Sequence, residues 1–246
     1  MYGHEIAQVY DIIYRQRKDY PAEADGFATL VADRFPAATS LLDVACGTGE
    51  HLVYLRKVFA RVEGLDLSGA MCDVARAKLP GVPIHQADMR TFQLDRRFDA
   101  VICPFSSIAH AGTPAELDAA IGRMAAHVER DGILVVEPWL FPETLAGARP
   151  QMHTATSGQL AHDVVEHDGR MVATVSHFSL SGRTAHMDVH HLFGEATGVR
   201  HFADALDMTL FERAEYEAAF ERAGCSVEYY EGSPWARGVF VGIQRR

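Results

Sequence analysis

Cysteine is scarce in this chain of 246 residues, which holds only Cys46, Cys72, Cys103 and Cys225 and no Cys-x-x-C pair. Scattered thiols of this kind favour neither a disulfide framework nor a structural zinc site, and we expect no bound metal. Three of the four fall in segments that we predict to lie in the core. We therefore expect reduced, buried thiols and a cytoplasmic location.

Long apolar runs and positive charge are also in short supply. No stretch approaches the roughly 18 to 20 apolar residues that cross a bilayer, and the first residues lack the basic and apolar regions of a secretory signal. The 23 Lys and Arg against 33 Asp and Glu give a formal net charge of −10. Nucleic acids and anionic membranes are bound through clustered Lys and Arg, so we expect neither as a partner. A small anionic substrate needs only one local cation.

Hydrophobic residues make up 48% of the chain, which is enough to form one hydrophobic core. That amount fits a single domain with an insertion or lid. We expect four successive parts: an N-terminal helical lid (1–36), a cofactor-binding core (37–138), an antiparallel β insertion (139–210) and a C-terminal helix with a hairpin (211–246).

Apolar spacing predicts helices alternating with buried strands over the first half of the chain. Helical spacing covers Ile6–Tyr20 and Pro21–Phe35. The predicted strands that follow are 41–44, 61–67, 82–86, 98–103 and 133–138. Helices are predicted at 51–59, from Ser68 onward, and at 115–128. Successive βα units of this kind predict an α/β fold, a Rossmann-like sheet with helices on both faces and all strand carboxyl ends along one crevice.

The pattern changes to strand-like alternation after Trp139. Strands are predicted at 172–178, 185–193 and 199–210, with glycine turns between them, which indicates an antiparallel insertion. A helix at 213–223 and a hairpin of strands at 226–231 and 239–243 are predicted to end the chain.

The turn after the first strand carries the most specific signal. Gly47 and Gly49 let the backbone bend sharply and admit a bulky adenosine, and Asp43 stands four residues before Gly47. A dinucleotide fingerprint would have a third glycine where Leu52 stands, which disfavours an NAD-dependent oxidoreductase. The segment resembles motif I of class I S-adenosylmethionine-dependent methyltransferases, D/E-x-x-x-G-x-G. An ordinary βα turn is the alternative.

Three acids, Asp43, Asp66 and Asp88, each follow a different predicted strand, so we expect their carboxylates to converge on one edge of the sheet. The resemblance implies that Asp66 holds the ribose of S-adenosyl-L-methionine, that Asp88 and the Met89 backbone read the adenine, and that Gly47 faces the methionyl part. A helix N-cap is the alternative for Asp88. The cofactor site that we expect comprises Tyr10, Tyr20, Asp43, Ala45, Gly47, Gly49, Asp66, Leu67, Met71, Asp88, Met89 and Phe105.

Further segments along nearly the whole chain carry a narrower resemblance: Asp11, Lys18-Asp19-Tyr20, Asp88-Met89-Arg90, Phe105-Ser106-Ser107-Ile108, Val135-Val136-Glu137-Pro138-Trp139, Phe141-Pro142-Glu143, Val175-Ser176-His177, Thr209-Leu210-Phe211 and Arg237-Gly238. Together with the glycine turn they resemble the N,N-dimethyltransferases of TDP-linked 3-amino-deoxyhexoses, which finish desosamine and mycaminose for macrolide antibiotics. The resemblance implies a TDP-amino sugar substrate that receives two methyl groups in succession. Relatives of this kind are commonly dimers.

A neutral amine attacks the methyl carbon of a sulfonium in line, so such an enzyme mainly positions and desolvates its reactants and accepts a proton. His110 follows the fourth predicted strand, and we expect its imidazole near the amine. A structural histidine is the alternative. The resemblance also brings Tyr2 to the amine and Tyr10 or Tyr20 to the cofactor. Helix packing would equally explain Tyr10 and Tyr14.

The expected substrate contacts are Tyr14, Ser107, Trp139, His177 and Arg237. The guanidinium of Arg237 suits a diphosphate, because it donates two parallel hydrogen bonds to phosphate oxygens. A surface salt bridge is the alternative.

The predicted insertion is rich in histidine, and His186, Asp188 and His190 would share one strand face. Such a trio suits a metal, but a polar sheet face or a subunit interface explains it better.

Three functional hypotheses follow. The first is an N-methyltransferase of a TDP-amino sugar. The second is an O- or N-methyltransferase of another small molecule with the same fold. The third is a non-catalytic cofactor-binding protein that supports a partner enzyme, since the glycine turn and the acids indicate binding and not turnover.

Overall fold

Two β-sheets and a set of flanking helices make up the structure, a computed structural model that describes residues 3–145 and 158–245. The larger sheet has seven strands in the order β10-β11-β5-β4-β1-β2-β3. Its strands are β1 (Ser40–Val44), β2 (Arg61–Asp66), β3 (Ile84–Gln86), β4 (Phe98–Cys103), β5 (Val128–Val136), β10 (Cys225–Gly232) and β11 (Trp235–Gln244). Strands β1 to β5 pair in parallel, and β11 is antiparallel to both β5 and β10.

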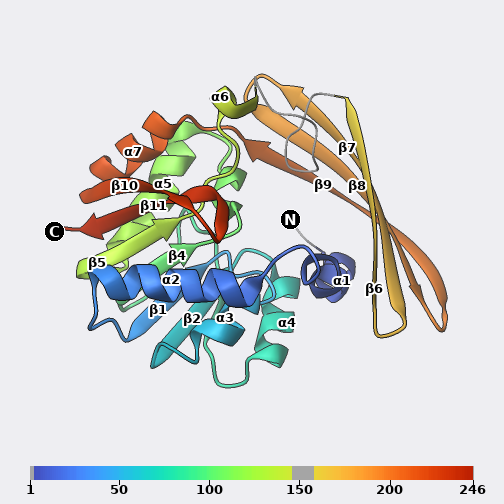
Figure 1. Cartoon of the computed structure of the whole chain (residues 1–246), viewed down its shortest axis with the longest axis horizontal. Coiled ribbons are helices and arrows are strands. Elements are labelled where there is room, and N and C mark those ends of the chain that lie inside the picture. Colours follow the sequence, from blue (N-terminus) through green and yellow to red (C-terminus); the bar gives the residue numbers. More distant parts are fainter. Residues whose placement is uncertain (1–2, 146–157, 246) are drawn as a thin grey trace.

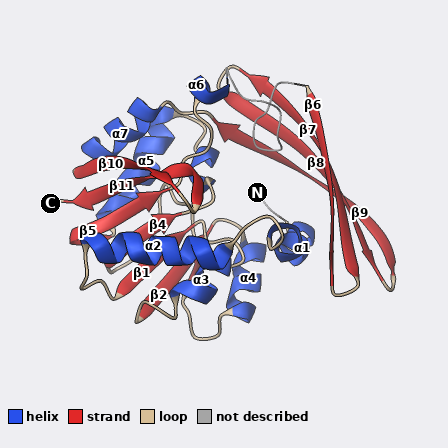
Figure 2. Cartoon of the chain, in the orientation of Figure 1, coloured by secondary structure: helices blue, strands red, loops and turns tan. Residues whose placement is uncertain are grey.

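Helices cover both faces of this sheet, as Figure 2 shows. The helices on one face are α2 (Tyr20–Arg34), α3 (Glu50–Leu55) and α4 (Gly69–Lys78), and those on the other are α5 (Pro114–Ala126) and α7 (Arg213–Arg222). Strand β1 is buried throughout because neighbours cover it on both sides. The predicted Rossmann-like α/β fold is confirmed.

A second sheet of four antiparallel strands stands beside the core (Figure 1). It consists of β6 (Gln159–His167), β7 (Arg170–Ser181), β8 (Thr184–Glu195) and β9 (Gly198–Thr209). This sheet is the predicted antiparallel insertion, and it joins the core through Trp139 and the short helix α6 (Pro142–Leu145). The sequence prediction missed β6. Apolar side chains lie on both of its faces, with Val164 exposed and Val165 buried, so the alternation that marks a half-buried strand is absent there.

The two faces of this sheet differ in their surroundings. Alternate residues of each strand, which we call the inner face, pack toward the core; they include Val172, Phe178, Phe193, Phe202 and Met208. The remaining alternate residues form the outer face, which no other described element covers in Figure 1. The outer face therefore meets solvent in the described part of the chain.

Helix α1 (His4–Tyr14) lies between the core and the inner face. It is shorter than the predicted helix, which continued to Tyr20. The chain breaks before α2 because the Asp19 carboxylate caps the second helix by accepting a hydrogen bond from Ala22 N at 3.0 Å, and Pro21 occupies its first turn. One continuous helix is thereby excluded.

All four cysteines are free and buried, as predicted. In residues 3–145 and 158–245, no helix is both long and apolar enough to span a membrane.

Candidate active site

Two sharp turns at the carboxyl ends of adjacent strands open the site. After β1, Ala45 and Gly47 have positive φ of 60° and 55°; after β4, Phe105 and Ser106 have 55° and 57°. Residues other than glycine seldom adopt this region, and they do so mainly at functional turns. The strand order reverses between β1 and β4, which is where ligands bind in open α/β sheets.

A cavity of about 240 Å³ lies at this edge, between the core, α1 and the insertion. Sequence reasoning predicted part of its lining: Tyr10, Ala45, Gly47, Asp66, Leu67, Met71, Asp88, Met89, Ser107 and His110. It missed the rest: Leu65, Ser68, Ala87, Arg90, Ala205, Leu206 and Asp207. The last three come from β9, and no local pattern could bring that strand to a cavity made by β1 and β2.

The glycine turn and Asp66 fit the sugar of a nucleoside. A Cβ built on Gly47 would meet no atom within 4 Å, so open space lies above it. The Gly47 N–H donates to Asp66 Oδ2 at 2.9 Å, and the Ser68 N–H donates to Oδ1 at 2.8 Å. Each carboxylate oxygen keeps a further acceptor site for a ribose hydroxyl. Apolar Leu65, Met71 and Met89 suit the faces of an adenine.

Asp43 is a buried carboxylate in need of a partner. It lies within β1 and not after it, is 0% exposed, and neither of its oxygens has a hydrogen-bond partner in residues 3–145 and 158–245. Burial, followed by repulsion from Asp66, raises its pKa well above the ordinary range. The half-buried Asp66, which contacts Gly47 and lines the cavity, and the buried Asp43 beneath the turn give this edge an acidic character that suits a cofactor with positive charge, and these residues therefore fit S-adenosylmethionine.

The Asp88 carboxylate forms hydrogen bonds with Arg90. Arg90 donates to it from its backbone N–H at 2.8 Å and from its guanidinium, which also reaches Glu116 at 2.6 Å. The first cause of the lowered Asp88 pKa is this side-chain hydrogen bond from Arg90. Both residues line the cavity, so the pair forms a rigid polar wall of the predicted adenine pocket.

His110 ends the short 3₁₀ helix η1 (Ser107–His110) and reaches the cavity. Its Nδ1 lies 3.1 Å from the carbonyl oxygen of Asp207 on β9. A carbonyl only accepts, so Nδ1 carries the proton and Nε2 of the neutral ring keeps its lone pair. Desolvation is the first cause that lowers the His110 pKa. Neutral His110 is therefore available as a proton acceptor.

Arg237 lies beside the second turn. Its Nη1 donates to Ser106 Oγ at 3.3 Å and lies 4.0 Å from a carboxylate oxygen of Glu137. The Phe105 N–H donates to the other oxygen of Glu137 at 2.6 Å, so Glu137 holds the turn and the guanidinium together. Burial lowers the pKa of Arg237. Only 19% of its side chain is exposed, which leaves a partly shielded cation at this edge of the site.

Helix α1 is fastened to the core by a cluster of charges. Asp11 accepts hydrogen bonds from Thr48 Oγ1 at 2.6 Å and from Lys78 Nζ at 2.6 Å. Lys78 also pairs with Glu50, which pairs in turn with Arg15 at 2.9 Å. These contacts fix the helix that carries Tyr10 into the cavity.

Several predicted site residues do not line the cavity. Gly49 caps α3, Asp43 is sealed beneath the turn, and Tyr20 packs on His51 with ring centroids 5.0 Å apart. Tyr14 packs on Phe105 at 5.0 Å. Tyr2 lies outside the described residues.

Trp139 and His177 are also set apart from the cavity. Trp139 packs with Phe178 between core and insertion. His177 lies on the outer face, 4.0 Å from Asp188, because strand alternation turns it away from the neighbouring buried Phe178.

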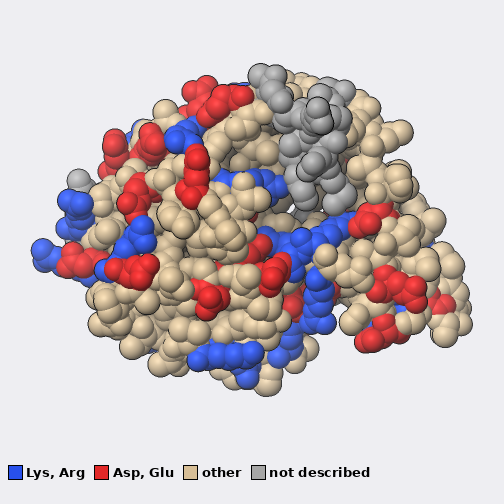
Figure 3. All heavy atoms as spheres, in the orientation of Figure 1, with Lys and Arg blue, Asp and Glu red and all other residues tan. Residues whose placement is uncertain are grey.

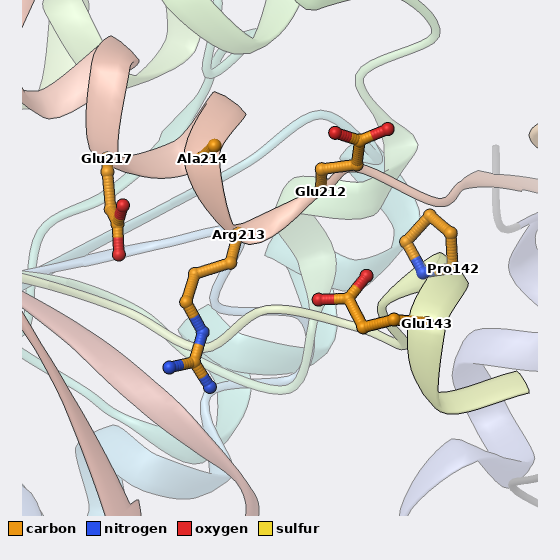
Figure 4. A pocket seen from close by; sticks show the side chains of 6 residues that line it. All are labelled: Pro142, Glu143, Glu212, Arg213, Ala214 and Glu217. Atoms are coloured by element: carbon orange, nitrogen blue, oxygen red, sulfur yellow. The ribbon is translucent and has the colours of Figure 1, made fainter. Parts of the chain in front are cut away.

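A second hollow, of about 520 Å³, lies away from the strand ends. Figure 4 shows the Arg213 side chain between Glu143 on one side and Glu217 on the other. Arg213 stacks on the Tyr229 ring at 4.1 Å and pairs with Glu231 at 2.9 Å. Within the described ranges, no group of three or more His, Cys, Asp or Glu is placed to hold a metal ion. The cavity at the strand ends, and not this hollow, unites the predicted residues.

Comparison with known proteins identifies the family. A sequence profile described as a methyltransferase domain matches residues 41–132. The chain is 49% identical over 245 residues to dTDP-3-amino-3,4,6-trideoxy-alpha-D-glucopyranose N,N-dimethyltransferase of Streptomyces venezuelae, and the match covers 99% of each chain. The chain belongs to this family of N,N-dimethyltransferases. It is an S-adenosylmethionine-dependent methyltransferase, as its sequence predicted, and not an oxidoreductase.

Solved structures agree with the fold of this methyltransferase. The crystal structure of Streptomyces venezuelae DesVI superposes with a TM-score of 0.89 at 48% identity, covering 99% of this chain and 100% of that one. The S-adenosylmethionine-bound structure of CalS10, an amino pentose methyltransferase from Micromonospora echinaspora, gives 0.83 at 42% identity, covering 99% and 98%. The insertion thus belongs to the shared fold.

Proposed function

We propose that this methyltransferase transfers methyl groups, two in succession, to the amino group of a TDP-linked amino-deoxyhexose in the biosynthesis of an antibiotic sugar. The observation that carries the proposal is the 49% identity to an enzyme named for such a substrate, over 99% of both chains. Similarity of that extent includes the β6–β9 insertion, which supplies Ala205, Leu206 and Asp207 to the cavity. The match therefore extends to the part of the chain that faces the acceptor.

The proposed mechanism follows from the site. Bound S-adenosylmethionine supplies an electrophilic methyl group on a sulfonium. Asp66 and Gly47 orient the nucleoside, while α1 and β9 exclude water from the reactants. His110, whose Nδ1–H is held by Asp207, accepts a proton from the substrate ammonium at Nε2 and so exposes the nitrogen lone pair. In-line positioning then supplies most of the rate enhancement.

Arg237 is the proposed contact for the diphosphate of the nucleotide. It is a partly buried guanidinium at the strand-end edge, held by Ser106 and Glu137. In Figure 3, Lys and Arg side chains also gather beside α1, along the hollow that faces the insertion. Arg17, which follows α1, donates to Asp163 of β6. Lys18 pairs with Glu23 at 2.9 Å and lies over the Phe105 ring at 3.9 Å. A local cluster of cations suits a dianionic nucleotide despite the net charge of −10.

We also propose that the protein is a homodimer joined through the outer face. That face carries most of the exposed large apolar side chains in the described part of the chain: Leu160, Val164, Met171, Val175, Leu192 and Val199. Among them lie histidines and acids, such as His186 and Asp207 at 2.6 Å. A patch with both apolar and complementary charged groups suits a second copy across a two-fold axis.

Free cysteines and a net charge of −10 suit a cytoplasmic protein, and we propose that this one binds neither nucleic acid nor membrane.

Methyl transfer from labelled S-adenosylmethionine to a panel of acceptors tests the substrate. We expect activity with TDP-3-amino- or TDP-4-amino-deoxyhexoses and a dimethylated product by mass spectrometry. An Arg237→Ala variant should raise KM for the TDP-sugar about 10-fold or more and leave the affinity for S-adenosylhomocysteine unchanged. Lys57→Ala, at an exposed site away from the cavity, is the control. Activity only with hydroxyl acceptors, or with small amines that lack a nucleotide, would contradict the proposal.

A further inference from the structure

Asp204 of β9 has a carboxylate oxygen that the folded chain leaves unpartnered. Among the described residues, its Oδ1 accepts a hydrogen bond only from the N–H of its neighbour, Ala205, at 3.1 Å. Its Oδ2 is buried and has no hydrogen-bond partner in the same part of the chain. Apart from Asp204, the described side chains with such an orphaned atom are Asp43 and Trp235. Buried polar atoms almost always have partners, so an orphan at the edge of a binding site indicates a ligand.

Strand alternation points Asp204 toward the reaction site. On β9, Phe202 packs against α1 and Met208 packs against Ala109 of η1. Asp204 and Leu206 lie between these two residues on the same inner face, and Leu206 lines the cavity. The carboxylate is therefore directed into the space between α1 and the 3₁₀ helix that carries His110.

Electrostatic interactions link Asp204 to groups on both sides of that space. Burial is the first cause that raises the pKa of Asp204, and the carboxyl group also interacts with the Tyr14 hydroxyl of α1 and with the imidazole of His110. Asp66, the residue that fits the ribose, acts on the same imidazole. His110 thus interacts with Asp66, on the cofactor side of the cavity, and with Asp204, on the side of the insertion. A nucleophile in contact with His110 and aligned with the methyl group would occupy the space that Asp204 faces.

We propose that Asp204 is a catalytic residue of this enzyme, whose carboxylate binds the reacting amino group of the substrate. This inference rests on the proposed function, because it needs an amine as the acceptor. Asp204 first pairs with the substrate ammonium, and His110 Nε2 removes one of its protons. The neutral amine keeps an N–H bond to Asp204 and directs its lone pair at the methyl carbon. The new C–N bond then forms as the C–S bond breaks, and its electron pair returns to sulfur.

The reaction gives this carboxylate an energetic role. One unit of positive charge leaves sulfur and appears on nitrogen, so an anion beside the nitrogen stabilises the transition state more than the bound reactants. Each methyl transfer releases one proton, which passes through His110 to solvent. Primary and secondary amines both have an N–H for Asp204, so the same carboxylate serves both transfers.

The test compares Asp204→Asn with the wild-type protein, using whichever TDP-amino-deoxyhexose the wild type methylates. Asparagine keeps the shape and a carbonyl acceptor but removes the charge. We expect kcat to fall about 10- to 100-fold, while S-adenosylhomocysteine affinity stays within about twofold. The affinity for the dimethylated product, a cation, should fall about 10-fold or more, but the affinity for TDP alone should not change. Asp168→Asn, in the turn between β6 and β7, is the matched control and should behave as wild type.

Two outcomes would overturn the role of Asp204. One is a kcat within about twofold of wild type, with only KM raised, which would assign the carboxylate to a neutral hydroxyl of the sugar. The other is a parallel loss of S-adenosylhomocysteine affinity and thermal stability, which would assign it to the fold. A wild-type protein that methylates no amino sugar would overturn the proposed function and this role together, whereas an active wild type with a fully active variant would overturn only the role.

Discussion

His110 and Asp43 illustrate how neighbours set the behaviour of single residues. His110 is held by one carbonyl, from Asp207, so its tautomer is fixed before any substrate binds. Asp43 has no hydrogen-bond partner among the described residues, so an unfavourable buried carboxyl group lies at the centre of the protein. Such an unfavourable group persists where function compensates for it, because a bound cation or donor would satisfy it.

Replacing His110 should change both the rate and its pH dependence. We expect His110→Phe to lower kcat about 100-fold, since a positioned general base contributes about that much. In the wild type, desolvation lowers the His110 pKa, so its neutral form persists below the ordinary imidazole range. The acidic limb of the kcat profile should therefore lie below pH ~6.5 and vanish in the variant. His167→Phe, in the β6–β7 hairpin, is the control. An unchanged limb would exclude His110 as the base.

Neutralising Asp43 should stabilise the protein and weaken cofactor binding. Its pKa is raised by burial, so the folded state favours the protonated acid and loses stability as pH rises above about 4. Asp43→Asn removes that cost, and we expect the free energy of unfolding to rise by about 1–3 kcal/mol at pH 7, with a smaller gain near pH 4. Calorimetric affinity for S-adenosylhomocysteine should fall about 10-fold. A less stable variant with full affinity would refute this account.

At the scale of elements, the position of α1 depends on Lys78, a cation that two acids share. Lys78 of α4 pairs with Asp11 of α1 and with Glu50 of α3, which is only 5% exposed. Burial by itself would raise the pKa of Glu50, but hydrogen bonds from Arg15 and Lys78 outweigh it and hold the pKa below its ordinary value. The cluster therefore stabilises the folded state fully at pH values above the ordinary pKa of a glutamate. This contribution is lost as the pH falls through the lowered pKa of Glu50.

Removing this cation should release α1 and, with it, part of the cofactor site. Lys78→Met leaves two carboxylates close together without their common partner, and we expect a loss of about 3 kcal/mol in the free energy of unfolding. Hydrogen exchange should quicken in α1, and S-adenosylhomocysteine affinity should fall because Tyr10 lines the cavity. Arg222→Met, which breaks an exposed pair with Asp118, should cost less than about 1 kcal/mol. Equal losses of unfolding free energy in the two variants would argue against a buried charge cluster that holds α1 in place.

The helices and parallel strands were predictable because their signals are local. Apolar spacing located α2, β4 and α7 to within a residue or two, and the glycine turn marked the start of the site. Strand β6 was not predictable, since Leu160 and Val164 are apolar yet exposed. Their exposure is consistent with the proposal that the outer face is a dimer interface.

At the scale of the whole molecule, the outer face should decide the oligomeric state. Val175 lies on β7, one of the two central strands of that sheet, and is 52% exposed. A carboxylate there would be buried without a partner in a dimer, so we expect Val175→Asp to be a monomer. Light scattering should give about 27.1 kDa for the variant and twice that for the wild type. Val58→Asp, 63% exposed on the core, should remain dimeric. A monomeric wild type would refute the interface.

The sequence by itself determined the fold class, the cofactor and the family. A positive φ at Gly47, an acid at the end of β2 and alternating βα units are all properties of short segments, and the resemblance rests on such segments. Only the tertiary structure decided which side chains line the cavity. It turned His177 away from the cavity, set Tyr20 against His51, and laid β9 across the site with Asp204 facing inward. The physical reason is that the face a strand presents depends on its register with distant segments, which no local pattern records.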